Sequence, residues 1–168
     1  MIVQSLLGEF EYEAVNTRKL LSAIPDSALE YKPQPFSWSI GQLASHIAEV
    51  YNWYDATLHQ DIFDMATYKY DKGDISKASN IAAKFEENLA KARTALQTAK
   101  DDDMFKEWKM VMGGADALFP PMPRVQVVRG FLFNHLYHHR GEMVAHLRAS
   151  GNTPPGLYGP NYEESQRS

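Results

Sequence analysis

The chain has 168 residues, 44% of them hydrophobic and 23% charged, which is the composition of one globular domain with a full core. Its net charge is −4 and no run of lysine and arginine exceeds two residues, which excludes the basic surface typical of nucleic-acid and anionic-membrane binders. No stretch of about 18 apolar residues is present and acidic residues interrupt the N-terminal segment, so we expect a cytoplasmic protein without membrane partners.

The first half of the chain predicts two helices. Apolar residues recur at three- and four-residue spacing over residues 2–23, the pattern of an amphipathic helix. Residues 31–38 contain two prolines and predict a loop, because each proline forces the residue before it out of the helical region. Ser37 or Ser39 then caps a second helix that we expect to reach about Leu58.

The second half predicts two longer helices separated by a connection. Residues 61–73 look irregular, and a third helix is expected from about Ile75 to Lys100. Residues 101–123 contain paired glycines and several prolines, which indicate a long connection with a short strand or turn around Trp108. The fourth helix is expected from about Pro123 to Ser150.

Four helices in one domain predict an all-α fold, a four-helix bundle that spans residues 1–168. No repeat or linker divides the chain. The long connections before the third and fourth helices permit a crossover topology. Residues 151–168 form the C-terminal extension, and we expect them to be an extended arm that packs back on the bundle.

The chain contains no cysteine. This excludes disulfides, cysteine zinc sites, iron–sulfur clusters and a cysteine nucleophile. Any metal must therefore be held by histidine, carboxylate and water, and any thiol that takes part in a reaction must arrive as a substrate.

Two histidines four residues apart, His135 and His139, are the strongest chemical signal. Positions i and i+4 of a helix share a face, so both imidazoles can reach one point. His46, on the second helix, is the best candidate for a third ligand. Three histidines from two helices would leave coordination positions open, which is the pattern of a reactive metal. The alternative for such a pair is partial burial with ordinary hydrogen bonds.

The other histidines are not expected to be ligands. On a regular helix His138 is rotated about 100° from His139, so it cannot bind the same metal. It would instead contact a ligand residue, or face an interface or solvent. His146 is expected to pack near the bundle end, and His59 to be a solvated helix-end residue.

Two carboxylates follow the candidate ligands at a spacing of three residues: Glu49 after His46, and Glu142 after His139. Each could accept a hydrogen bond, act as a base or be a simple helix carboxylate, and for Glu49 we favour the last. Other site patterns are absent from the sequence, including Glu-x-x-His, His-Glu-x-x-His, a glycine-rich phosphate loop and Gly-x-Ser-x-Gly.

Two segments of the sequence resemble a known superfamily. The run Asn134-His-Leu-Tyr-His-His-Arg-Gly-Glu, with the later Tyr158-Gly-Pro160, resembles the C-terminal signature of the DinB/YfiT-like superfamily. The run Phe36-Ser-Trp-Ser-Ile40, followed by His46, resembles the first ligand helix of that family. The resemblance extends over nearly the whole chain by helix order.

The resemblance implies an up-down-down-up four-helix bundle, often dimeric, that holds one divalent metal, zinc or nickel, through three histidines. Carried over to this sequence, the ligands are His46, His135 and His139. Glu142 stands where the family usually has glutamine, so an extra carboxylate could alter the charge and substrate preference of the site.

Relatives of this kind include thiol transferases, a thiol-dependent isomerase and hydrolases. The resemblance therefore implies a metal-dependent enzyme that acts on a small molecule, with a low-molecular-weight thiol as a possible cosubstrate. The aromatic segments 51–54 and 131–137 suggest a homodimer. The alternative is a non-catalytic protein that binds a metal or small ligand at a structural or vestigial three-histidine site.

Overall fold

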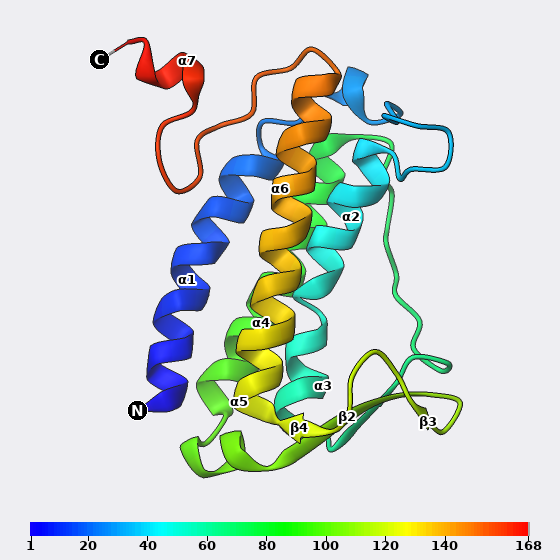
Figure 1. Ribbon diagram of the computed structural model, residues 1–168, viewed down its shortest axis with the longest axis vertical. Coiled ribbons are helices and arrows are strands. Elements are labelled where there is room, and N and C mark those ends of the chain that lie inside the picture. The colour runs from blue at the N-terminus through cyan, green and yellow to red at the C-terminus, as the bar shows by residue number, and fades with distance from the viewer. Residues whose placement is uncertain (168) are drawn as a thin grey trace.

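The computed structural model describes residues 1–167 and consists of a helical bundle with a small sheet at one end (Figure 1). The long helices are α1 (Ile2–Leu21), α2 (Ile40–Val50), α3 (Trp53–His59), α4 (Ala78–Thr98) and α6 (Asn134–Ala149). The shorter helical segments are η1 (Asp26–Ala28), η2 (Asp101–Phe105), α5 (Arg124–Gln126), η3 (Val127–Phe133) and α7 (Tyr162–Ser165). The strands are β1 (Ile62–Asp64), β2 (Glu107–Met112), β3 (Ala115–Asp116) and β4 (Met122–Pro123).

The bundle has four rods, because α2 and α3 follow one another along one axis (Figure 1). The first and last rods, α1 and α6, run in one direction, whereas α2–α3 and α4 run in the other. This is the up-down-down-up order that the resemblance implies. Residues 60–77 cross the length of the bundle to start α4 beside the start of α2. The connection before the last rod does not cross, so only the first of the two long connections is a crossover.

That second connection stays at one end of the bundle and folds into the sheet. Strand β2 pairs in parallel with β1 and antiparallel with β3 and β4. The buried Trp108 indole donates a hydrogen bond to the carbonyl of Ala56 at 3.1 Å, which fastens β2 to α3. The expected all-α fold therefore describes the bundle but not the sheet of four short strands. Of these strands, the sequence indicated only a short strand or turn around Trp108.

A break divides the second rod where one continuous helix was expected. The side-chain amide of Asn88, in α4, donates to the carbonyl of Ala48 at 2.9 Å. That carbonyl would otherwise accept from the backbone N–H of Asn52, which instead donates to Glu49 at 2.7 Å. A contact between two rods thus ends α2 and starts α3.

The last rod also departs from a regular α-helix. Residues Val127–Phe133 form a π-helical segment, η3, between α5 and α6. Such segments are rare and widen the helix by one residue per turn. The segment ends two residues before His135, so it helps set the direction in which the imidazoles of α6 point.

All four rods contribute buried apolar side chains to one core. Among the fully buried ones are Phe10, Leu20, Ile40, Leu43, Phe85, Leu89, Leu132, Leu136 and Met143. Ser39 rather than Ser37 caps α2, and its side chain and that of Gln42 form a reciprocal capping box. Among residues 1–167, no helix is both long enough and apolar enough to cross a membrane.

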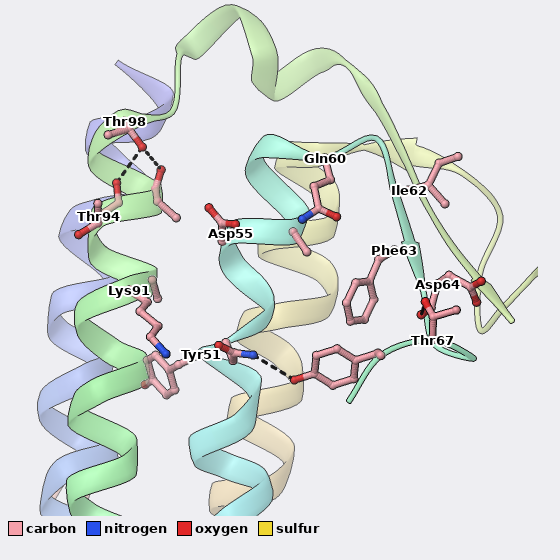
Figure 2. A pocket seen from close by; sticks show the side chains of 15 residues that line it. Tyr51, Asp55, Gln60, Ile62, Phe63, Asp64, Thr67, Lys91, Thr94 and Thr98 are labelled. Atoms are coloured by element: carbon pink, nitrogen blue, oxygen red, sulfur yellow. Dashed lines mark hydrogen bonds between the residues drawn. The ribbon is translucent and has the colours of Figure 1, made fainter. Parts of the chain in front are cut away.

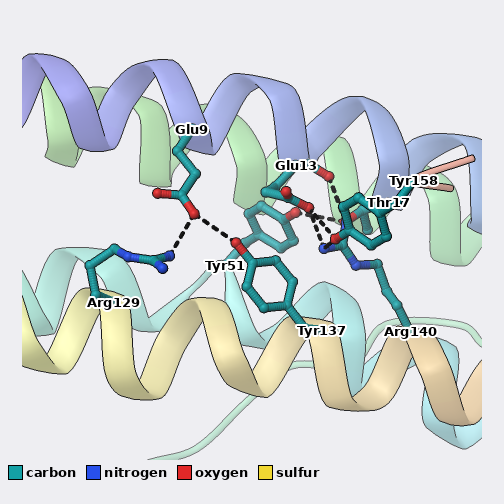
Figure 3. Close-up of polar contacts among 8 residues, drawn as sticks. All are labelled: Glu9, Glu13, Thr17, Tyr51, Arg129, Tyr137, Arg140 and Tyr158. Carbon is teal, nitrogen blue, oxygen red and sulfur yellow. Dashed lines mark hydrogen bonds and ion pairs between the residues drawn. The ribbon is translucent and has the colours of Figure 1, made fainter.

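The C-terminal arm lies against α1 and α6 (Figure 3). The Tyr158 hydroxyl donates to Glu13 at 2.7 Å, and Arg140 donates to both Glu13 and Tyr158. The Arg140 and Glu13 side chains are only 1% and 6% exposed, so this ion pair is buried. Lys19 also donates to the carbonyl of Gly156 at 2.6 Å.

Candidate metal centre

Three imidazoles meet between α2 and α6. The Nε2 atoms of His46 and His139 each lie 2.9 Å from the Nε2 atom of His135. One ligand nitrogen from each of the three residues lies within 4.8 Å of the other two. The structure therefore brings together the three residues that the sequence pattern selected as candidate ligands.

The arrangement follows from local structure. His135 and His139 are one helical turn apart on α6, so they share the face that packs against α2. His46 lies about two turns after the Ser39 cap, which fixes where α2 begins and hence the phase of the helix. Each ligand candidate is therefore held by a regular helix rather than by a loop.

Each of two imidazoles is oriented by a carboxylate one turn later. Glu49 lies 2.9 Å from Nδ1 of His46, and Glu142 lies 2.9 Å from Nδ1 of His139. An ionised carboxylate only accepts hydrogen bonds, so each Nδ1 carries the proton and each Nε2 presents a lone pair. The interpretation of Glu49 as a simple helix carboxylate was wrong, and its spacing, the same as that of Glu142, was the signal.

Burial favours the neutral form of His135 and His139. Burial, with the nearby charges of His139, His46 and His138 as smaller causes, lowers the pKa of His135 to about 3. Burial also lowers the pKa of His139, although its hydrogen bond to Glu142 opposes this change. Neutral imidazole is the form that binds a metal.

The three Nε2 atoms have too few protons to hydrogen-bond with one another, which fits a cation at the centre of the cluster. The Nε2 atoms of His46 and His139 are acceptors, and the Nε2 atom of His135 could donate one proton to only one of them. At least one lone pair then faces another nitrogen without a proton between them. A divalent ion would accept all three lone pairs.

The spacing also fits such an ion. Nitrogens bonded at about 2.1 Å to one ion lie about 3.0 Å apart at right angles and about 3.4 Å apart at tetrahedral angles. The two observed separations of 2.9 Å lie within a few tenths of an ångström of this range.

Aromatic rings enclose two sides of the cluster. Trp53 meets His135 and His46 edge to face, with ring centroids 5.4 and 5.8 Å apart. On another side, Trp38 stacks on His139 at 5.8 Å and meets His46 at 4.9 Å. Trp53 is buried, whereas Trp38 is 45% exposed, so the approach from solvent passes beside Trp38.

A small cavity of about 240 Å³ opens at that approach. It is lined by Trp38, Gln42, Ser45, His46, Glu49, Tyr70, Lys72 and Ile75. The volume of the cavity is below the range of about 300–1,000 Å³ typical of pockets for drug-sized ligands, so the cavity suits a ligand smaller than these.

The remaining histidines lie outside this cluster. His138 is exposed, and one of its nitrogens lies within 4.8 Å of ligand atoms of His139 and Glu142. His146 turns away, because its Nδ1 donates to the carbonyl of Glu142 at 2.9 Å. His59 lies at the end of α3 and bonds to Asp55 at 3.0 Å.

Comparison with known proteins gives one family. The model of the DinB family matches residues 1–168. The uncharacterized protein YrdA of Bacillus subtilis is 30% identical over 158 residues, which make up 94% of this chain and 89% of YrdA.

Solved structures share the fold. A DinB-like protein from Bacillus cereus superposes with a TM-score of 0.70 at 26% identity, over 92% of this chain and 97% of that one. YfiT from Bacillus subtilis has a TM-score of 0.65 at 16% identity, over 90% and 89% of the two chains. YfiT is described as a probable metal-dependent hydrolase with an unusual four-helix bundle topology.

Proposed function

The chain belongs to the DinB family, and we propose that it is an enzyme that uses one divalent metal to activate a small thiol or a water molecule. The metal would be held by His46, His135 and His139. The observation that carries the proposal is the convergence of the Nε2 atoms of three imidazoles. In two of these imidazoles the Nδ1–H group donates a hydrogen bond to a carboxylate. The description of YfiT as a probable metal-dependent hydrolase supports it by analogy of fold.

A divalent ion at these nitrogens would supply Lewis-acid chemistry, in which the pKa of a bound water or thiol falls toward neutrality. The donor set of three imidazoles suits zinc or nickel. Three protein ligands leave positions for a substrate, and a small molecule would approach them through the cavity beside Trp38, which His46 lines but His135 and His139 do not. A thiol would have to come from solution, because the chain has no cysteine.

The residues around the ligands have separable tasks. Glu49 and Glu142 hold two imidazoles in the tautomer that faces the centre. Glu142 is the more exposed of the two, with a side chain 34% accessible, and its second oxygen is the candidate base for a proton released at the site. Trp53 excludes water from the inner side of the cluster.

A non-catalytic metal site is the competing function, and the partial cover of the cluster by Trp38 favours it. Titration of the cobalt-loaded protein with a small thiol separates the two. The enzyme proposal predicts a new thiolate-to-cobalt absorption band and the release of a proton. His135→Ala should abolish the band, whereas the matched variant His138→Ala should keep it. A cobalt protein that shows no spectral change with thiols or with hydroxide would establish the non-catalytic function.

We also propose a homodimer, which the resemblance implies. The aromatic segments that first suggested it do not support it, because Tyr51, Trp53, Tyr54 and Phe133 are buried inside the bundle. Exposed apolar side chains remain on α1, where Tyr12 and Val15 lie one turn apart. Light scattering should give twice the 19.1 kDa chain mass, and a value near 19.1 kDa would refute the dimer.

A further inference from the structure

A second, larger cavity of about 780 Å³ lies away from the histidine cluster. In Figure 2, α3 forms its back, with α4 on one side and the segment containing β1 on the other. It is lined by Tyr51, Asn52, Asp55, Ala56, Gln60, Ile62, Phe63, Asp64, Thr67, Tyr68, Lys91, Ala92, Thr94, Ala95 and Thr98. Its volume lies within the range of about 300–1,000 Å³ found for small-molecule sites.

The indole of Trp53 separates this cavity from the candidate metal centre. One side of the indole contacts His135 and His46. Its ring also contacts Phe63 and Tyr68, at centroid distances of 6.4 Å each, and these two residues line the cavity. None of the three candidate ligands lines it. A molecule bound there would therefore occupy a site of its own.

The walls of the cavity are held in place by the fold. The side-chain amide of Asn52, which directly precedes α3, donates to the Tyr68 hydroxyl at 3.2 Å and so ties the start of α3 to the crossover segment. Asp64 accepts from the backbone N–H groups of Ala66 and Gly113, at 2.9 and 3.3 Å. The cavity is thus preformed, so a ligand need not order a loop to bind.

The charges of the lining favour a cation. Two aspartates and one lysine line the cavity, and the lysine ammonium, Lys91, is already bound to Glu87 at 2.7 Å. Among residues 1–167, neither Asp55 nor Asp64 pairs with a lysine or arginine, because Asp55 bonds to His59 and Asp64 to backbone N–H groups. One oxygen of Asp55 takes the Nδ1 proton of His59, which leaves its other oxygen available as an acceptor.

The C-terminal end of α4 also favours a cation in the cavity. Thr94, Ala95 and Thr98 belong to the last turns of α4, whose final turn contains no basic residue. The C-terminal end of a helix carries a partial negative charge and favours a nearby cation. Helix α4 has 21 residues, so this end effect is fully developed.

The apolar part of the lining adds a second requirement. Phe63 and Tyr68 form a tilted aromatic pair with centroids 4.9 Å apart, and Ala56, Ala92 and Ala95 present methyl groups. Aromatic faces bind both apolar groups and cations. A ligand that combines a positive charge with an apolar body would match both halves of the cavity.

We propose that this cavity is a binding site for small organic cations that join an ammonium group to an aromatic or apolar body. Asp55 receives the ammonium, and the aromatic pair of Phe63 and Tyr68 contacts the body. The site works independently of the metal centre and does not depend on the function proposed above.

The test compares three probes of similar shape by titration calorimetry: 2-phenylethylamine, 2-phenylethanol and phenylacetate. We expect saturable binding of the amine, weaker binding of the alcohol and none of phenylacetate. Asp55→Asn should weaken amine binding about two- to fivefold, the effect of one exposed charge pair. Asp102→Asn removes the same charge at an exposed position outside the cavity lining and should leave the affinity unchanged. Thr94→Trp should block the cavity and abolish binding.

Several results would overturn the proposal. They are equal binding of amine and alcohol, no saturable binding of the amine, an equal loss in Asp55→Asn and Asp102→Asn, and unchanged binding in Thr94→Trp. The titration is repeated after removal of metal with a chelator. Unchanged affinity supports a separate site, whereas loss of binding would place the amine at the histidine cluster instead.

Discussion

The side chain of Asn88 bonds to the backbone carbonyl of Ala48, with 2.9 Å between nitrogen and oxygen, and this contact decides where α2 ends. The turn that follows starts α3 at Trp53, the residue that packs against the candidate metal ligands. One buried amide therefore links the packing of two rods to the wall of the site.

Replacement of Asn88 by leucine should lower the free energy of unfolding by about 1–3 kcal/mol, because the buried carbonyl of Ala48 loses its partner. Urea unfolding followed by circular dichroism measures the change. Asn80→Leu is the control, since the Asn80 amide bonds to Asp74 in an exposed setting. Its cost should stay within about 0.5 kcal/mol. Equal costs in both variants would contradict the role assigned to Asn88.

The ion pair between Arg140 and Glu13 gives a larger effect. Arg140→Met leaves a buried carboxylate without its cation and should cost about 3–5 kcal/mol of stability. Arg18→Met breaks an exposed pair with Glu86 and should cost at most about 1 kcal/mol. The double variant Glu13→Gln with Arg140→Met should recover part of the loss. Thermal and urea unfolding check all three, and no recovery in the double variant would show that the pair is not the cause.

Alkaline pH should destabilise the protein through its buried tyrosines. Burial raises the pKa of Tyr51 to about 12 and raises that of Tyr54 well above its usual range. The folded chain then keeps protons that the unfolded chain loses near pH 10. This stabilisation is complete below pH 10 and is lost as the pH rises from about 10 toward 12, at up to about 1.4 kcal/mol per pH unit for each tyrosine. Urea unfolding at a series of values from about pH 8 to about pH 11 measures the slope.

Tyr54→Phe isolates one of these groups. The Tyr54 hydroxyl is buried and has no hydrogen-bond partner among residues 1–167, so its removal should leave stability near neutral pH unchanged or raised. The variant should also lose less stability than wild type above pH 10. The exposed Tyr12→Phe should behave as wild type. A Tyr54→Phe slope equal to that of wild type would mean that another group is responsible.

The carboxylates behind the ligands should tune metal affinity. Glu49→Gln and Glu142→Gln each weaken the orientation of one imidazole, and losses of such partners typically cost about 10- to 100-fold in affinity. Competition with a coloured chelator measures this. Glu30→Gln, at an exposed position, is the control. Unchanged metal affinity in both Glu49→Gln and Glu142→Gln would show that these carboxylates do not orient the imidazoles.

Sequence reasoning found the parts of the site that depend on helical phase. The spacing of His135 and His139 fixes a shared face, and His46, on another predicted helix, was the best candidate for a third ligand, which the resemblance supported. It misjudged Glu49, because a carboxylate three residues after a histidine is common in helices without any functional role.

The parts of the fold that sequence reasoning missed depend on contacts between distant residues. The break after α2 requires Asn88, which lies 40 residues from Ala48 in the chain. Strand β1 forms only where β2 pairs with it, and its three residues show no strand pattern of their own. The π-helical turn before His135 likewise has no local sequence signal that distinguishes it from a regular helix.

Elemental analysis of the protein purified without a nickel column tests directly whether the three histidines hold a metal. We expect about one zinc or nickel ion per chain in the wild-type protein and in His138→Ala, because three imidazoles converge without the help of His138. His135→Ala should retain almost none while remaining folded by circular dichroism. A wild-type protein that contains no divalent metal and binds none when it is supplied, or a His135→Ala variant that binds as much as wild type, would show that these histidines do not form a metal site.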